Sequence, residues 1–568
     1  MELDKYQQAA AETEQRRVLI AAVPGSGKTR TLCGRVMHLV EGGVRPVQIA
    51  MITFTRYAAR EMQSRLDDEA RSTWVGTFHS FALDIIQNYG SERGWEPSWL
   101  TILDEKEAEQ EEVDALQDFA LVNSRGIGKP AAIRAWREYR DAKINGEAIK
   151  PDNNSGLHAS IFASFYNRLR AENVMTFGVM ILEAIQILEC VPGAAEAYHK
   201  RFQHILMDEA QDSDENQWRL LWLINPLNVY IVGDIDQAIY EWRGAKPELF
   251  MEFAKTATVY QLPYSYRFGV TLAEPANKLI KHNKMRLDVA IEAIGENKGT
   301  LHVENEIAAS DVAELIRQEL HDGTPLDDIA VLARTHRTLD DIAQQLAGKK
   351  IPHVKIGGKA DIRSTYPYRV IRGYLRLAVN QRDKRAFMAI VNVERIENKD
   401  LWEMRRSAID NKKTLVETYD KPLPATLEEL PEYLAKRDPV TPYGDALRYV
   451  KRLRDFEGLS DLGDMVRYMS LEQGQDQLRD AEGKIPLCTI HAAKGLEWST
   501  VFLVGMNAGQ FPSPRSVKAG NMEEERRLCY VGMTRAEDNL FIVEGLPERK
   551  GDGPSSFLGE LLDTPADI

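Results

Sequence analysis

The segment AAVPGSGKT at residues 21–29 follows the short apolar run of residues 18–20 and precedes a helix-like segment. This order of strand, Gly-rich turn and helix is typical of a phosphate-binding loop. Backbone N–H groups of the loop can approach phosphate oxygens, Lys28 can reach the outer phosphates, and the Thr29 hydroxyl can hold Mg²⁺. Ala22 stands where the common pattern has its first Gly, and the alternative is a Gly-rich turn without a ligand. We expect a nucleoside triphosphate to contact Pro24, Gly25, Ser26, Gly27, Lys28 and Thr29.

Strand-like apolar runs recur along the chain and alternate with helix-like segments. They occupy residues 205–207, 229–232, 329–332 and 501–504, and this alternation is typical of parallel α/β sheets. Two long, charged, helix-favouring stretches interrupt it, and 568 residues suffice for several domains. We therefore expect two α/β lobes, each interrupted by a mainly helical insertion. The expected bounds are 1–84 and 201–257 for the first lobe, 85–200 for its insertion, 258–365 and 485–568 for the second lobe, and 366–484 for its insertion.

Composition narrows the protein class. No segment approaches the ~18 consecutive apolar residues of a membrane span, and the N-terminus lacks a basic region followed by an apolar one, so we expect a cytoplasmic protein. The cysteines Cys33, Cys190, Cys488 and Cys529 form no CxxC pair and are expected to be buried small residues. A net charge of −14 by itself disfavours nucleic acid as a partner, although an acidic protein can carry a positive groove.

An acidic pair follows the run of residues 205–207. In a phosphate site, Asp208 would hold Mg²⁺ and Glu209 would orient or deprotonate an attacking water. By itself, such a pair is more often a solvated loop or a helix cap. Because the carboxyl ends of parallel strands meet at one edge of a sheet, the presence of Lys28 favours the phosphate site.

Residues 232–245, VGDIDQAIYEWRGA, follow the next strand and are expected to face the same crevice. Gln237 is suited to sensing a terminal phosphate. Tyr240 and Trp242 offer flat faces on which bases could stack, at ~1–3 kcal/mol each. The alternative for Trp242 is a core position, because Trp is highly buried on average.

The ordered set of segments resembles superfamily 1 DNA helicases of the UvrD/Rep/PcrA type over nearly the whole chain. LDKYQQAA (3–10) resembles the adenine-reading Q motif, and TFTRYAAREM (53–62) and VGTFHSFA (75–82) resemble two single-strand-binding motifs. The segments 262–268, 487–506 and 523–536 resemble motifs IV, V and VI. The resemblance implies two RecA-like P-loop NTPase lobes with parallel sheets.

The resemblance also implies roles for single residues. Tyr266 would stack on the adenine, Gln7 would hydrogen-bond the edge of the base, and Glu497 would contact the ribose. Arg267 and Arg535 would reach the γ-phosphate from the second lobe as arginine fingers. The implied catalytic residues are Lys28, Asp208, Glu209, Gln237, Arg267 and Arg535. The implied metal-holding residues are Thr29 and Asp208, and a further nucleotide contact is Arg30.

The resemblance also implies which residues contact DNA, and the sequence departs from the family pattern at some positions. The implied DNA contacts are Phe54, Thr55, Arg56, Thr77, His79, Tyr240, Trp242, Thr489 and His491. For both histidines the alternative is a hydrogen-bonded structural role. The second insertion is shorter than expected, and VNVERIEN at 391–398 replaces the duplex-contacting Gly turn of the family, which argues against duplex binding there.

Taken together, the residues and the resemblance predict an ATP- and Mg²⁺-dependent DNA helicase of replication or repair that moves on single-stranded DNA. The resemblance alone implies that the movement runs 3′ to 5′. Expected partners are single-stranded DNA, single/double-strand junctions and replication or repair proteins, with the chain a monomer or weak dimer. One alternative is a protein-displacing translocase that unwinds weakly. Another is a nucleotide-gated DNA-binding scaffold that does not cycle.

Overall fold

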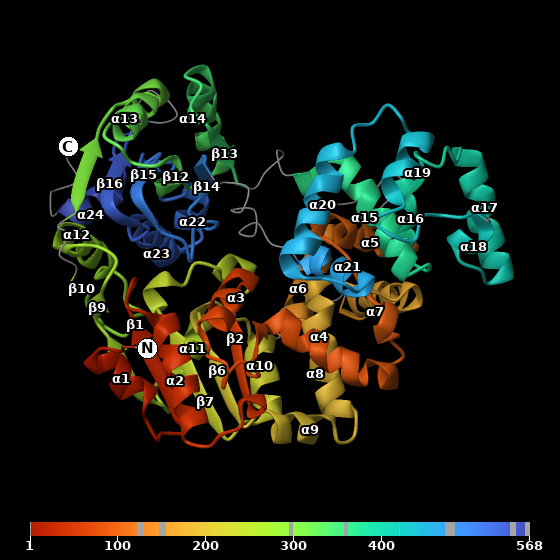
Figure 1. Cartoon of the computed structure of the whole chain (residues 1–568), viewed down its shortest axis with the longest axis horizontal. Coiled ribbons are helices and arrows are strands. Elements are labelled where there is room, and N and C mark those ends of the chain that lie inside the picture. The colour runs from red at the N-terminus through yellow and green to blue at the C-terminus, as the bar shows by residue number, and fades with distance from the viewer. Residues whose placement is uncertain are drawn as a thin grey trace. The chain divides into compact units, whose positions relative to one another are not determined.

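The computed structural model describes residues 2–121, 130–146, 155–294, 299–356, 362–419, 421–471, 483–545 and 553–562. The chain forms two compact units (Figure 1). The first comprises Met1–Phe78, Glu196–Gly358 and Gln473–Ile568, and the second comprises His79–Ala195 and Lys359–Glu472. The first unit contains two six-stranded sheets, which form the cores of the two lobes.

The first sheet is parallel and has the order β3-β2-β6-β7-β1-β8. Its strands are β1 Arg17–Ala22, β2 Ile49–Thr53, β3 Trp74–Thr77, β6 His204–Met207, β7 Asn228–Gly233 and β8 Thr258–Leu262. Its helices are α1 Lys5–Ala11, α2 Lys28–Glu41, α3 Arg56–Arg65, α9 Ala194–Arg201, α10 Glu215–Ile224 and α11 Pro247–Ala254. β2 is buried along its whole length, as expected for a parallel strand covered on both faces. Because β6, β7 and β1 are neighbours, their carboxyl ends meet at one edge.

The second sheet is also parallel, with the order β11-β16-β15-β12-β14-β13. Its strands are β11 Thr300–Glu304, β12 Ile329–Ala333, β13 His353–Lys355, β14 Ile485–Thr489, β15 Trp498–Val504 and β16 Ala536–Val543. Its helices are α12 Val270–Ile280, α13 Ala309–His321, α14 His336–Gly348, α22 Pro514–Lys518, α23 Met522–Met533 and α24 Ser556–Leu562. A short pair, β9 Tyr264–Ser265 and β10 Glu292–Ala293, precedes it. The predicted α/β class with two parallel sheets is confirmed.

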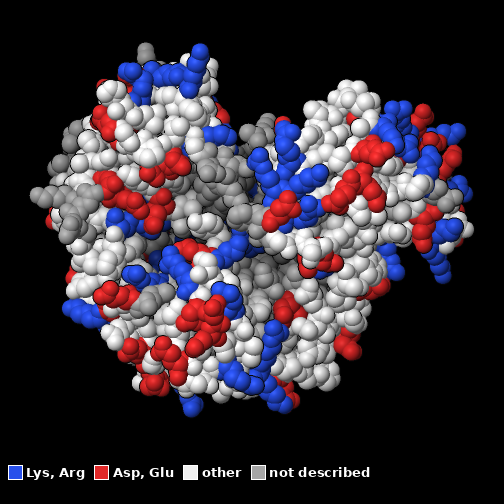
Figure 2. Space-filling model, viewed as in Figure 1, with Lys and Arg blue, Asp and Glu red and all other residues white. Residues whose placement is uncertain are grey.

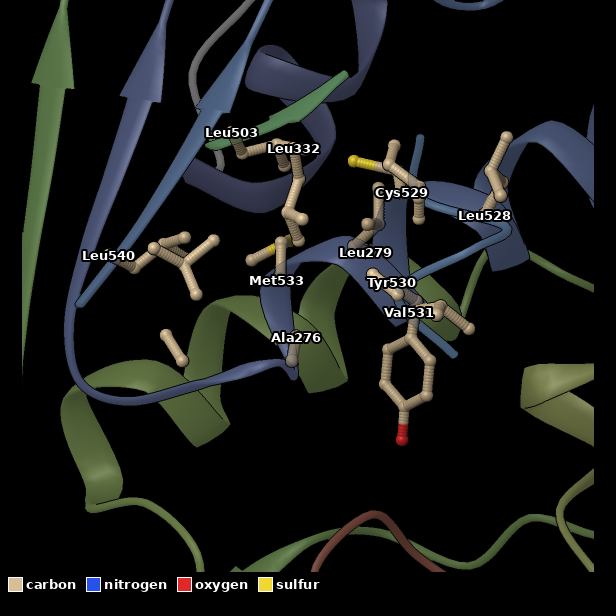
Figure 3. Close-up of a cluster of buried hydrophobic side chains, with 14 of the residues drawn as sticks. Ala276, Leu279, Leu332, Leu503, Leu528, Cys529, Tyr530, Val531, Met533 and Leu540 are labelled. Carbon is tan, nitrogen blue, oxygen red and sulfur yellow. The ribbon is translucent and has the colours of Figure 1, made fainter. Parts of the chain in front are cut away.

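One hydrophobic core of the second lobe lies between its sheet and the helices α12 and α23 (Figure 3). Leu332, Leu503 and Leu540 come from three adjacent strands, and Leu279 comes from α12. The hydroxyl end of Tyr530, on α23, extends away from the cluster. This packing fixes α23, which ends just before Arg535.

The second unit is mainly helical and contains both insertions. The helices of the first insertion are α4 Phe78–Tyr89, α5 Glu105–Asp118, α6 Pro130–Asn145, α7 Ser155–Glu172 and α8 Phe177–Cys190, and its strand pair is β4 Thr101–Ile102 and β5 Val174–Met175. The helices of the second insertion are α15 Tyr366–Val379, α16 Lys384–Ile390, α17 Asn398–Asn411, α18 Leu415–Tyr419, α19 Leu430–Arg437, α20 Gly444–Glu457 and α21 Leu462–Leu471. No single helix among the described residues is long and apolar enough to cross a membrane; α8 and α9 pass that test only as a pair bent by 102°.

The two insertions are joined by buried and partly buried polar groups, which the sequence did not predict. Arg376 Nε donates to Asp383 Oδ2 at 2.8 Å and its Nη1 donates to Glu107 Oε1 at 2.5 Å. Asn380 Nδ2 donates to the Glu172 carbonyl at 2.9 Å, and Arg385 Nε donates to Glu111 Oε1 at 2.5 Å. We call the contacts of Arg376, Asn380 and Arg385 with the first insertion the insertion seam. The pair of Arg376 and Asp383 lies within the second insertion and supports this seam.

Two expectations need correction. Residues 258–262, expected in the second lobe, form β8 and pair with β1 at the edge of the first sheet. Four of the five side chains of β8 are not buried, so the segment carries no buried-strand pattern. Cys190 is exposed at the end of α8, whereas Cys33, Cys488 and Cys529 are buried as expected.

Candidate nucleotide and nucleic-acid sites

The phosphate loop forms the turn between β1 and α2. Gly25 and Gly27 have φ values of +73° and +76°, in the region that favours glycine. A Cβ on Gly25 would lie 2.6 Å from the Cβ of Arg267, and one on Gly27 would lie 2.6 Å from Nε2 of Gln7. Conformation and space therefore both require glycine. Because α2 begins at Lys28, its N-terminal N–H groups border the turn.

The helix α1 and the segment after β8 border this loop. Asp4 caps α1 in a capping box that holds Gln7, and Gln7 Nε2 donates to the Ser26 carbonyl at 2.9 Å. Tyr266 N–H donates to the Gly25 carbonyl at 3.0 Å, while its hydroxyl donates to Asp4 Oδ2 at 2.6 Å. The side chain of Tyr266 is 46% exposed, so a flat aromatic surface stands beside the loop.

Asp208 and Glu209 follow β6 at the carboxyl edge of the first sheet. Asp208 is buried, which excludes the solvated-loop alternative, and Glu209 Oε1 lies 3.8 Å from Lys28 Nζ. Burial and the adjacent Glu209 raise the pKa of Asp208 to about 7. Burial would also raise the pKa of Glu209, but Lys28 and Lys494 lower it to about 2. Glu209 is therefore ionised at neutral pH.

The residues around the loop fit a magnesium ion. Asp208 Oδ1 is buried and has no hydrogen-bond partner within the described part of the chain, and the same is true of Ser26 Oγ. Thr29 lies in the first turn of α2. The described residues contain no group of three or more His, Cys, Asp or Glu that could hold a metal, but Mg²⁺ usually takes one or two carboxylates together with substrate phosphates and water.

Arginines of the second lobe reach the first lobe at this edge. Arg535 is 2% exposed, and its Nη2 donates to Gln237 Oε1 at 3.2 Å. Arg267 Nε donates to Glu497 Oε2 at 2.7 Å, and its Nη1 donates to the Thr534 carbonyl at 2.8 Å. Burial and the nearby Arg267 lower the pKa of Arg535 to about 9. Two guanidinium groups this close favour an anion between the lobes.

Lys494 also belongs to this site, although it was not predicted. Its Nζ pairs with the Asp212 carboxylate, lies 3.6 Å from Glu209 Oε2 and donates to the Gln237 carbonyl at 2.6 Å. Gln211 Nε2, likewise unpredicted, donates to Glu209 Oε2 at 2.6 Å. Both residues lie in or next to segments that the sequence analysis named, 205–209 for Gln211 and 487–506 for Lys494. Because they lie in irregular turns, no periodic pattern of apolar residues predicts where their side chains point. We call the set Lys28, Asp208, Glu209, Gln237, Arg267, Lys494 and Arg535 the hydrolysis site.

A groove of about 790 Å³ is lined by residues of both lobes. Phe54 and Tyr240 stack with ring centroids 4.9 Å apart and 18° between their planes. Trp242 is 64% exposed, which excludes the core alternative, and meets the His491 ring edge-on at 5.8 Å. Arg243 lies 5.5 Å from the Trp242 ring centroid. Further lining residues are Arg334, Thr335, His336, Thr489 and Arg515. We call this cavity the aromatic groove.

Four expected DNA contacts do not line the aromatic groove. Thr55 caps α3 by accepting from the Ala58 N–H at 3.1 Å, and Arg56 begins that helix. Thr77 is buried at the end of β3. The His79 ring packs edge-on against Phe177 at 5.2 Å within the second unit, which agrees with a structural role.

The fold and these sites define a P-loop protein whose two RecA-like lobes share a nucleotide-type site and an aromatic groove. More particularly, the chain belongs to the UvrD/REP helicase family. The model of the UvrD/REP helicase N-terminal domain matches residues 3–258, and that of the UvrD-like helicase C-terminal domain matches residues 260–406 and 397–544.

Two relatives have similar sequences along nearly their whole length. ATP-dependent DNA helicase PcrA of Staphylococcus aureus (strain Mu50 / ATCC 700699) is 28% identical over 638 residues, which cover 99% of this chain and 86% of the relative. ATP-dependent DNA helicase PcrA of Staphylococcus epidermidis (strain ATCC 12228 / FDA PCI 1200) is 27% identical over 633 residues, which cover 98% of this chain and 86% of the relative.

Proposed function

We propose that this protein is an ATP-dependent DNA helicase that moves 3′ to 5′ along single-stranded DNA and couples ATP hydrolysis to duplex separation. The observation that carries the proposal is the convergence of both lobes on one site. Lys28 and Glu209 come from the first lobe, whereas Arg535 and Lys494 come from the second. The adjacent aromatic groove is also built from both lobes, so one movement would act on both ligands.

Hydrolysis would proceed on the phosphate loop. Lys28 would contact the outer phosphates, and ionised Glu209 would accept a proton from the water that attacks the γ-phosphorus as the bond to ADP breaks. Mg²⁺ held by Thr29 and Asp208 would neutralise charge on the β- and γ-phosphates. Gln237 would sense the γ-phosphate.

The second lobe would complete the nucleotide site. Arg267 and Arg535 would stabilise the charge that develops on the phosphoryl oxygens. Tyr266 would stack on the adenine, Gln7 would bind its edge, and Glu497 would contact the ribose. Arg30, exposed on α2, is proposed as a further contact. Loss of the γ-phosphate removes the anion that both arginines share, so the lobes would separate after hydrolysis.

The aromatic groove would hold the single strand. Exposed Trp242 would stack on a base, while Thr489, His491 and the stacked pair Phe54 and Tyr240 would shape the groove beneath it. Burial and Arg334 lower the pKa of His491 to about 4, so its ring is neutral at pH 7 and contributes hydrogen bonding or stacking rather than charge. Stacking is tolerant of sequence, as a translocase requires.

The first test is ATP hydrolysis with and without single-stranded DNA or RNA, measured for wild type and Lys28→Ala. We expect DNA-stimulated hydrolysis that the variant abolishes. Undiminished hydrolysis by Lys28→Ala would refute the site, and wild-type hydrolysis indifferent to nucleic acid would refute the motor. Duplexes with a 3′ or a 5′ single-stranded tail test direction, and preferential unwinding of the 5′-tailed duplex would overturn the 3′-to-5′ assignment.

A protein-displacing translocase with weak unwinding is the second candidate, and residues 391–398 favour it. Glu394, inside this segment, is buried and accepts from the hydroxyls of Tyr419 at 2.5 Å and Tyr433 at 2.8 Å, with Tyr374 as a third donor. The segment therefore serves internal packing. Poor strand separation in a multiple-turnover assay, together with removal of a bound protein from single-stranded DNA, would select this candidate.

We propose single/double-strand junctions and unidentified replication or repair proteins as partners, with the chain acting as a monomer or weak dimer. Sedimentation with and without a tailed duplex measures the assembly, and a stable higher oligomer would contradict it.

A further inference from the structure

A separate cavity lies at the amino ends of three strands of the first sheet. It has a volume of about 420 Å³ and is lined by residues of three short segments, 45–48, 72–75 and 200–202. These segments stand just before or at the start of β2, β3 and β6, which are neighbours in the sheet. The hydrolysis site instead follows the carboxyl ends of β6 and β1, so the whole length of β6 separates the two sites. We call this cavity the amino-edge pocket.

The lining of the amino-edge pocket is positively charged, although the chain as a whole has a net charge of −14. None of its described lining residues is Asp or Glu, whereas three of them are cations, the exposed Arg45, Lys200 and Arg201. Arg45 Nε donates to the neutral Gln48 side chain at 3.2 Å. Lys200 pairs with Glu196 at 2.6 Å, but an exposed pair of this kind contributes little. The pocket therefore favours an anion, and guanidinium groups suit phosphate in particular.

Aromatic rings and a buried hydroxyl complete the lining. Trp74 is half-buried and lies edge-on to Phe202 at 6.3 Å, while the Arg201 guanidinium lies 4.5 Å from the Phe202 ring centroid. Thr73 is 4% exposed, and its hydroxyl has no hydrogen-bond partner within the part of the chain that the structure describes. A buried polar group without a partner costs about 1–3 kcal/mol, which a hydrogen bond to a ligand would recover.

We propose that the amino-edge pocket binds a nucleotide at a place distinct from the hydrolysis site. Arg45, Lys200 and Arg201 hold its phosphate, the Thr73 hydroxyl bonds to the phosphate or the sugar, and Trp74 contacts the base. The volume lies within the range of about 300–1,000 Å³ of small-molecule sites, so the pocket suits a single nucleotide. Two sources present this chemistry, a free mononucleotide and the 5′-phosphorylated end of a strand. The inference does not depend on the proposed helicase activity.

Calorimetric titration of the full-length protein tests the pocket, with the hydrolysis site saturated by a non-hydrolysable ATP analogue and Mg²⁺. The titrants are thymidine 5′-monophosphate, thymidine and inorganic phosphate. We expect the monophosphate to bind more tightly than thymidine or phosphate. Arg201→Met should raise its Kd by roughly 10- to 150-fold, the loss of one charge-assisted hydrogen bond, and Thr73→Val by roughly 2- to 12-fold. Arg219→Met is the matched control, because Arg219 is an exposed arginine on α10 outside the pocket, and it should leave the Kd unchanged.

An oligothymidylate with or without a 5′-phosphate distinguishes the two sources. Tighter binding of the phosphorylated strand, lost in Arg201→Met, assigns the pocket to a strand end, whereas equal binding of both strands assigns it to the free monophosphate. Absence of saturable binding of the monophosphate, or an equal Kd in wild type and Arg201→Met, would overturn the proposal. Inorganic phosphate that binds as tightly as the monophosphate would overturn the assignment to nucleotides. Basal ATP hydrolysis should be unchanged in Arg201→Met, so the pocket and the proposed function stand or fall separately.

Discussion

At the residue scale, three side chains within six positions of one segment have different surroundings. Gln237 is buried in the hydrolysis site, Tyr240 is buried beneath the groove, and Trp242 is exposed in the groove. Two short 3₁₀ turns, Ile235–Gln237 and Glu241–Arg243, produce the change of direction. The segment therefore connects the hydrolysis site to the aromatic groove.

Trp242→Ala should weaken binding of a short single-stranded oligonucleotide by roughly 5- to 150-fold, since one stacked base is worth ~1–3 kcal/mol. Fluorescence anisotropy measures the affinity. Trp402→Ala is the matched control, because Trp402 is 60% exposed but lies in the second unit. Equal affinities for the two variants would exclude Trp242 as a stacking platform.

Glu209→Gln should lower DNA-stimulated kcat for ATP by about 10²–10⁴, the usual contribution of a general base, while preserving the size of the side chain. ATP affinity, measured with a fluorescent analogue, should change little because Lys28 and the loop remain. A variant with near-normal kcat would remove Glu209 from the proposed role.

The proximity of site residues could be predicted where a side chain has a fixed place relative to a strand. Asp208 and Glu209 directly follow β6, and Lys28 begins α2 after the phosphate loop that follows β1. Their meeting at one edge could therefore be expected, and Lys28 Nζ lies 3.8 Å from Glu209 Oε1. Lys494 lies in a turn, so neither a periodic pattern of apolar residues nor a position at the end of a strand predicts that it belongs to the site. Thr77 and His79 were expected to contact DNA by resemblance, but they fall outside the groove.

At the element scale, short runs of apolar residues predicted the buried central strands of the sheets. The edge strand β8 has no such apolar run, because most of its side chains are not buried. The insertion seam was also beyond prediction. Arg376 and Glu107 are 269 positions apart, and each alone resembles an ordinary charged residue of a helix surface. Only the fold shows that the side chains of Arg376 and Asp383 are 1% and 0% exposed.

Arg376→Met should destabilise the second unit by about 3–5 kcal/mol, because it leaves the buried carboxylate of Asp383 without its arginine. Glu107 keeps Arg372 as a partner at 3.3 Å. Urea unfolding followed by tryptophan fluorescence measures the change. Arg382→Met is the control, since Arg382 pairs with Glu96 at an exposed position and should cost about 0–1 kcal/mol. Similar losses in both variants would mean that the seam contributes no specific stability.

At the scale of the whole molecule, a net charge of −14 coexists with local positive surfaces. Figure 2 shows Lys and Arg side chains gathered in a band where Figure 1 labels α3. Arg243 and Arg515, in the aromatic groove, form no ion pair with any residue that the structure describes. Net charge therefore gave the wrong expectation about partners when considered alone.

Binding of single-stranded DNA should consequently weaken as salt rises, with a slope of log K against log salt of about −1.4 or steeper if both groove arginines contact phosphates. Anisotropy titrations across a salt series measure the slope. Arg515→Met should make it shallower by about 0.7, whereas Lys518→Met should not. A slope near zero would show that phosphate contacts do not hold the strand.

The two compact units have separate hydrophobic cores, so heating should produce two calorimetric transitions. A non-hydrolysable ATP analogue with Mg²⁺, at 100 times its Kd, should stabilise only the unit that contains the hydrolysis site, by about 2.7 kcal/mol. Arg376→Met should lower only the other transition, because the insertion seam lies within the second unit. Lys28→Ala should abolish the shift caused by the analogue and leave the second transition in place. A single transition that responds to both the analogue and Arg376→Met would show instead that the units unfold as one, and that stability gained at the nucleotide site extends into the insertions.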